Sequence, residues 1–187
     1  MSCSLNSRIV DLVAPLARAP SSVGRRRLVM ATAAMPFAVW GSSDPLAGLQ
    51  AWGRGEYRRY GFLVYEARLW AGEDPLRPPL ALRLDYKRSL KGKAIAEASV
   101  SEMRQLGADD SRLSAWYEQM AALFPDVNEG DFILGAYQGQ TARFYYNGRW
   151  LGEIADAVFA RRFFDIWLDP KTSAPQLRAA LLQRSEK

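Results

Sequence analysis

The residues best suited to chemistry lie close together in the stretch "EYRRYGFLVYEARLW", residues 56–70 of the 187-residue chain. Arginine carries a planar fork that binds a carboxylate or a phenolate through two parallel hydrogen bonds, and tyrosine donates a further one. If the stretch is one strand, alternation places Arg58 and Tyr60 on one face. Arg59 and Tyr65 then lie on the other face. An arginine that borders an apolar cleft would bind an anion there, whereas the alternative is that both arginines begin the strand in solvent.

Two absences narrow the chemistry further. The sequence has no histidine, which removes Ser-His and Cys-His catalysis and most familiar zinc sites. Its one cysteine, Cys3, lies near the N-terminus, so we expect neither a disulfide within the chain nor a thiol nucleophile in the folded part. Carboxylates, Tyr, Lys, Ser and Thr remain for acid–base chemistry. We therefore expect no metal site and no cofactor.

The charge pattern argues against a nucleic-acid partner. The formal net charge is +5, but the Lys and Arg residues are scattered among Asp and Glu rather than gathered in a run that follows a phosphate backbone. The triplet Gly53-Arg54-Gly55 is too short for a phosphate-binding loop, and a strand rather than a helix follows it. This triplet therefore indicates a turn before a strand.

Residues 1–43 predict an export signal. Three arginines precede a 13-residue apolar stretch, Leu28 to Trp40, and a polar "GSSDP" follows it. The arginines and the apolar residues after them are similar to a twin-arginine signal. Because a bilayer span needs about 20 residues, the stretch is too short for a membrane helix, and we expect cleavage near residues 41–43. The mature domain, residues 44–187, would then be exported to a bacterial periplasm without a stable membrane span. The alternative is an amphipathic N-terminal helix of a cytoplasmic protein.

Hydrophobic alternation predicts the strands of the mature chain. Residues 56–70 form one long strand, or two strands joined at Gly61. In "LALRLDYKR", residues 80–88, every second side chain is apolar up to Tyr86, which is typical of a half-buried antiparallel strand. Three further short strands, "FILGAY", "TARFYY" and "RWLGEI", predict a β-meander. Its second turn is Asn147-Gly148, the strongest two-residue hairpin signal.

Helical spacing of apolar residues, with capping residues at the ends, predicts four helices. They are "KGKAIAEASVSEMRQLG", "DDSRLSAWYEQMAALFPDV", "DAVFARRFFDIWLDP" and "SAPQLRAALLQ". The order is two or three strands, two helices, three strands and two helices. This order predicts an α+β fold in which helices cover one face of an antiparallel sheet.

Several of these segments together resemble the bacterial chalcone-isomerase-like proteins, over about residues 51–182. The specific pieces are the strand that ends in "VY", the helix that ends in "LG", "FPDVNEGD" before a strand, the "NG" hairpin and the "DPKTSAP" link into the last helix. The resemblance implies an open-faced β-sandwich, which is a large antiparallel sheet with helices packed on one face.

The resemblance also implies two kinds of function. Plant chalcone isomerases close a chalcone ring by intramolecular addition, assisted by an arginine and by Thr, Tyr and Asn residues in the cleft. Related members are non-catalytic and bind fatty acids through an arginine and a tyrosine. The catalytic Thr, Tyr, Asn and second Thr positions correspond here to Tyr60, Lys91, Ala98 and a position near Ile166. The polar catalytic set is therefore lost.

The arginine of the family falls between residues 53 and 59, where Arg54, Arg58 and Arg59 compete, and we favour Arg58.

Three hypotheses on the function follow. The favoured one is an exported, non-catalytic binder of a small apolar acid, fatty or aromatic, with Arg58 on the anion and Tyr60 and Tyr65 as hydrogen-bond donors. The first alternative is an isomerase or intramolecular lyase of the chalcone-isomerase type. The second is a module that docks a protein partner through its aromatic sheet and has no ligand pocket.

Overall fold

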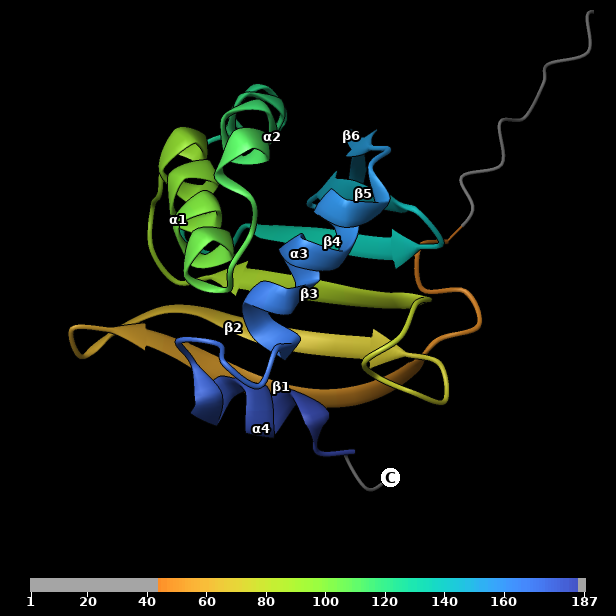
Figure 1. Ribbon diagram of the computed structural model, residues 1–187. Coiled ribbons are helices and arrows are strands. Elements are labelled where there is room, and N and C mark those ends of the chain that lie inside the picture. Colours follow the sequence, from red (N-terminus) through yellow and green to blue (C-terminus); the bar gives the residue numbers. More distant parts are fainter. Residues whose placement is uncertain (1–43, 185–187) are drawn as a thin grey trace, which may run out of the picture. The chain divides into compact units, whose positions relative to one another are not determined.

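Six strands form one antiparallel sheet in which each strand pairs with the next along the chain (Figure 1). The structure is a computed structural model and describes residues 44–184, so the predicted export signal at residues 1–43 lies outside the described residues. The strands are β1 (Gln50–Arg59), β2 (Phe62–Ala71), β3 (Leu80–Tyr86), β4 (Phe132–Gln138), β5 (Thr141–Tyr146) and β6 (Arg149–Ile154). The predicted meander is therefore the second half of a longer one.

Four helices accompany the sheet: α1 (Gly92–Gln105), α2 (Asp110–Leu123), α3 (Ala157–Leu168) and α4 (Pro175–Leu182). The first two are inserted in the meander between β3 and β4. An isolated antiparallel bridge between Leu90 and Val127 joins the segment before α1 to the segment after α2. The Asp156 carboxylate caps α3 by accepting hydrogen bonds from the backbone N–H groups of Val158 and Phe159. None of the helices between residues 44 and 184 is long and apolar enough to cross a membrane.

The turn between β1 and β2 decides between the two expectations for residues 56–70. Tyr60 (φ 50°) and Gly61 (φ 81°) both have left-handed backbone, as a type I′ hairpin turn requires. The chain reverses there, and Arg59 pairs with Phe62 across the hairpin. The assumption of unbroken alternation through Gly61 is therefore wrong, because paired residues of a hairpin share a face. The first strand also begins at Gln50, before the predicted Glu56.

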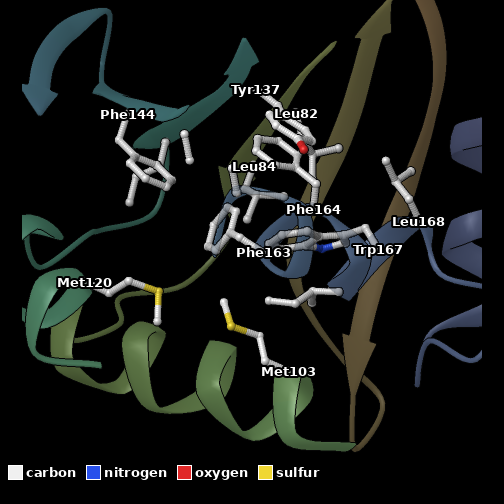
Figure 2. Close-up of a cluster of buried hydrophobic side chains, with 14 of the residues drawn as sticks. Leu82, Leu84, Met103, Met120, Tyr137, Phe144, Phe163, Phe164, Trp167 and Leu168 are labelled. Carbon is white, nitrogen blue, oxygen red and sulfur yellow. The ribbon is translucent and has the colours of Figure 1, made fainter. Parts of the chain in front are cut away.

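The hydrophobic core lies between the helices and one face of the sheet, with α3 at its centre. Figure 2 shows Phe163, Phe164 and Trp167 of α3 between the strands and the methionines of α1 and α2. Phe163 meets Phe144 of β5 edge to face at 5.1 Å between ring centroids, and Tyr137 of β4 stacks on Phe164 at 5.4 Å. All five side chains are buried. Their burial supplies the main driving force for docking α3 on the sheet.

The opposite face of the sheet is largely polar and charged. It carries ion pairs such as Arg143 with Glu153 and Lys87 with Glu66. A small apolar cluster on this face is covered by residues that precede β1; it consists of Ala81, Leu134 and Ala136, with Leu46, Leu49, Trp70 and Tyr145 packed against it. The predicted α+β architecture, an open-faced sheet with helices on one face, is confirmed.

At the β1 edge, the close approach of α4 requires glycine. A Cβ atom at Gly53 would lie 2.1 Å from the carbonyl oxygen of Ala180 in α4, and one at Gly55 would lie 2.9 Å from the side chains of Ala180 and Leu177. The triplet around Arg54 is therefore part of a strand rather than the predicted turn, and its glycines serve helix packing.

We expect Gly53→Ala to lower the free energy of unfolding by about 1–3 kcal/mol, because the added methyl group meets backbone atoms of α4 that cannot turn aside. The matched control is Gly72→Ala, at a position where a Cβ atom meets nothing within 4 Å. The control should change the stability by less than about 0.5 kcal/mol. Urea unfolding of both variants checks this, and equal effects would contradict the packing role of Gly53.

Candidate ligand-binding cavity

A cavity of about 530 Å³ opens between the sheet, at the end where β1 turns into β2, and helices α1 and α3. This volume is within the usual range for sites that hold small molecules. Residues from β1, β2, β3, β4, α1 and α3 line it, together with residues that follow β3, follow α2 and precede α4, and most of its surface is apolar. Its buried floor consists of Leu84, Tyr86, Ser99, Phe124, Ile133, Phe163, Ile166 and Trp167, together with the half-buried Tyr65.

Three tyrosines from neighbouring strands lie side by side at the cavity. Tyr57 pairs with Tyr65, and Tyr65 pairs with Tyr86, so the three side chains share the helix-covered face. Tyr57 stacks on Tyr65 with ring centroids 4.9 Å apart, and Tyr65 meets Tyr86 edge to face at 6.1 Å. This row gives the cavity an aromatic wall that carries hydroxyl groups.

The hydroxyl groups of Tyr65 and Tyr86 are hydrogen-bond donors rather than bases. Burial raises the pKa of both tyrosines well above the ordinary value of 10.0, so both stay protonated at neutral pH. The indole N–H of Trp167 donates to Tyr65 Oη at 2.9 Å, which occupies this oxygen as an acceptor and leaves its proton available to a ligand. Tyr86 also lines the cavity, and among the described residues its hydroxyl group makes no side-chain hydrogen bond.

The exposed mouth of the cavity carries two arginines. The guanidinium group of Arg59 lies over the Tyr60 ring, 5.5 Å from its centroid, and that of Arg88 lies over the Phe62 ring at 4.7 Å. All four side chains line the cavity. Among residues 44–184, neither arginine forms a salt bridge, so both positive charges are available to an anion.

The structure brings Arg59, Tyr60 and Tyr65 of the predicted set together at the cavity, but not Arg58 or Arg54. Arg58 forms an ion pair at 2.8 Å with Glu56, two residues away on the same strand. Arg54, like Glu56, lies on the polar face of the sheet, away from the helices. Of the three competing arginines, the cavity is therefore lined by Arg59 and not by the favoured Arg58. A binding role for any of these residues stays a prediction.

Sequence reasoning missed Arg88, Tyr86 and Glu102 as cavity residues. The alternation in residues 80–88 placed Tyr86 on the inner face of its strand, and this was the available signal. Nothing in the sequence indicates that Arg88 lies beside Phe62, since this neighbourhood depends on the β2–β3 register. Glu102 lies on the half-buried side of α1 and contributes to the raised pKa of Tyr65.

Of the four positions that the resemblance relates to the family's catalytic residues, three line the cavity and one does not. Tyr60, Ala98 and Ile166 line the cavity. Lys91 does not line it; this residue precedes α1 as its N-cap and pairs with Asp126 at 2.6 Å. Within the described residues, no three His, Cys, Asp or Glu side chains gather as a metal site would need.

The comparisons with known proteins agree with the fold described above. The family model described as chalcone isomerase-like matches residues 68–183, which is more than half of the chain, so the chain belongs to the chalcone isomerase-like family. The match includes β3 to β6 and all four helices, whereas β1, the turn at Tyr60 and most of β2 precede it. No curated protein matches the sequence.

A solved structure of similar fold is that of a fatty-acid binding protein from Arabidopsis thaliana. The likeness covers 73% of this chain and 87% of the Arabidopsis chain, with a TM-score of 0.56 and 12% sequence identity. At this identity the likeness shows the fold alone. It agrees with the open-faced sheet described above.

The raised pKa values of the two tyrosines predict a loss of stability at alkaline pH. Below about pH 10, each hydroxyl is protonated in both the folded and the unfolded chain, so its contribution is constant. Above this value the unfolded chain loses the proton first, and each group lowers the free energy of unfolding by about 1.4 kcal/mol per pH unit.

We therefore expect Tyr86→Phe to lose stability more slowly than the wild type above about pH 10, since it lacks one of the two groups. Tyr65→Phe should show the same shallower slope, with lower stability already at neutral pH because the indole N–H of Trp167 loses its acceptor. Urea unfolding from about pH 8 to 11 measures both. Identical slopes in all three proteins would show that these hydroxyl groups ionise as freely in the folded state as in the unfolded one.

Proposed function

We propose that this protein binds a small apolar acid, fatty or aromatic, in the cavity and does not transform it. One observation carries the proposal: an apolar, hydroxyl-bearing floor meets a mouth with two arginines that have no carboxylate partner among residues 44–184. An acid with an apolar body matches this division, because its body leaves water while its carboxylate stays beside the guanidinium groups.

The charges indicate which way round the ligand lies. Glu102 is the one carboxylate among the lining residues, and it is close enough to the Tyr65 hydroxyl to raise the pKa of this tyrosine. A ligand carboxylate beside Glu102 would meet a like charge in a half-buried place, which is unfavourable. The carboxylate therefore belongs at Arg59 and Arg88, and the apolar body extends toward Phe163 and Ile166.

Binding without turnover agrees with the protonation of the floor. Tyr65 and Tyr86 keep their protons at neutral pH and therefore cannot accept one from a substrate. Their hydroxyl groups are suited to donate hydrogen bonds to a carbonyl or hydroxyl group of the ligand. The Arabidopsis protein of similar fold is a fatty-acid binding protein, which supports the proposal that a fold of this kind encloses such a ligand.

We also propose that residues 1–43 direct export, as their arginines and apolar stretch predict. Replacing Arg25 and Arg26 by lysine should retain the precursor inside a bacterial host, because a twin-arginine signal requires the pair. The control is Arg54→Lys, which lies in the folded domain. Fractionation with an antibody against the protein measures the distribution, and export of the double variant at the wild-type level would contradict a twin-arginine signal.

For ligand binding, we expect dodecanoate to bind the full chain and Arg59→Ala or Arg88→Ala to weaken it about fivefold each, since an exposed ion pair contributes up to about 1 kcal/mol. Dodecanol should bind all variants equally, because it has no charge for the arginines to contact. The matched control is Arg58→Ala, whose guanidinium group pairs with Glu56. Isothermal calorimetry measures the affinities, and cinnamate tests the aromatic class.

Each other outcome points to a different hypothesis. If Arg58→Ala weakens dodecanoate binding and Arg59→Ala does not, the anion lies on the polar face and our placement is wrong. Consumption of a chalcone, followed by its absorbance, would favour the isomerase alternative. Absence of binding by dodecanoate, dodecanol and cinnamate would leave the protein-docking alternative.

A further inference from the structure

The tip of the β1–β2 hairpin, residues 59–62, exposes two large aromatic side chains. Tyr60 is 86% exposed and Phe62 is 59% exposed, the two largest values for large hydrophobic side chains between residues 44 and 184. In Figure 1 this hairpin end projects past the end of α1. Aromatic surface that stays in water contributes nothing to the stability of the fold. The exposure of these two side chains therefore suggests a role in function.

The turn itself is built against the usual preference. Tyr60 has φ 50° at the first turn position, where Asn, Asp or Gly is favoured because larger side chains are strained in left-handed backbone. The β5–β6 hairpin of the same chain has nearly the same backbone, with φ 49° and 79°, and it contains the expected Asn147-Gly148. The first hairpin therefore combines a strained backbone position with an exposed aromatic ring, although a small polar residue would suit the fold better.

Positive charge flanks the two rings. The guanidinium groups of Arg59 and Arg88 lie over the rings of Tyr60 and Phe62, and neither forms a salt bridge with a residue in the described range 44–184. Arg58, on the other side of the hairpin, is exposed and pairs with Glu56. Exposed aromatic rings with cations beside them match the headgroup region of a bilayer, where the rings enter the interface and arginines bind lipid phosphates.

We propose that the hairpin tip docks this protein on an anionic lipid surface. Two side chains are too small an apolar patch for a stable protein interface, which buries about 800 Å² on each partner. A bilayer requires no such complementary area, because each inserted ring and each arginine contributes separately. The same four side chains also line the mouth of the cavity, so docking would bring the mouth against the membrane. This inference goes beyond ligand binding and does not depend on it.

The first test places an environment-sensitive fluorophore at the tip. In full-length protein with Cys3→Ser, we attach the NBD group to Arg58→Cys, the position directly before the tip, or to Gln140→Cys at the β4–β5 turn as the control. With vesicles of equal parts phosphatidylglycerol and phosphatidylcholine, the emission of the tip label should shift to the blue and that of the control label should not. All proteins contain the same N-terminal residues, so these cannot produce a difference between the labels. A shift at both labels, or at neither, would overturn the proposal.

The second test measures binding by co-sedimentation with the same vesicles. Arg59→Ala and Arg88→Ala should each weaken vesicle binding about fivefold. The double variant Tyr60→Asn with Phe62→Ser should weaken vesicle binding more than either arginine variant does. The matched control, Trp150→Ser, removes another exposed aromatic, which is 53% exposed on β6. Pure phosphatidylcholine or high salt should remove the effect of the arginines. Equal binding by wild type and tip variants would refute docking.

Tyr60→Asn separates function from stability. Asparagine is tolerated in left-handed backbone, so this variant should melt about 2–4 °C above the wild type while binding vesicles more weakly. A variant that is destabilised and still binds would show that Tyr60 serves the fold. Dodecanoate binding is measured separately, in buffer without vesicles. If the protein binds dodecanoate but not vesicles, only the docking proposal is refuted.

Discussion

The structure depends on covering one apolar face of a six-stranded antiparallel sheet. An antiparallel sheet can leave one face in water only if the other is buried, and here four helices bury it. The centre is closed by the aromatic side chains of α3, and the β1 edge is closed by α4, which approaches so near that Gly53 can have no side chain. The helices do not pack closely on the sheet at the end where β1 turns into β2, and the space between them there is the cavity.

The cavity and its rim divide their chemistry according to burial. Charges are costly to bury, so the floor has hydroxyl groups whose raised pKa keeps them neutral, and the arginines lie at the exposed mouth. The hairpin that provides Arg59 and Tyr60 for the mouth also ends in exposed aromatic rings. One short segment thus serves both proposed contacts, with an apolar acid on its inner side and with lipid headgroups at its tip. The family match begins after this segment, at residue 68.

Most of the fold followed from local patterns. Alternation in residues 80–88, the Asn147-Gly148 turn, the helical stripes and the capping residues are properties of a few neighbouring residues, and the structure has the corresponding elements. The errors arose where local signals compete. Tyr60 is a strand-forming residue at a turn position, so the hairpin was hidden within an apparently continuous run. The glycines around Arg54 indicated a turn but serve the packing of a helix more than 120 residues away in the chain.

By itself, the sequence determined the class of fold and the absence of histidine chemistry, and it indicated the segment that contains Arg59, one of the two arginines that line the cavity. Only the tertiary structure decided which arginine faces the cavity, because one reversal at Tyr60 and Gly61 changes which side chains share a face. It also brought Arg88 and Tyr86 to the site through the pairing of β2 with β3. Such neighbours depend on register and on turn geometry, which long-range packing selects and which no short stretch of residues specifies.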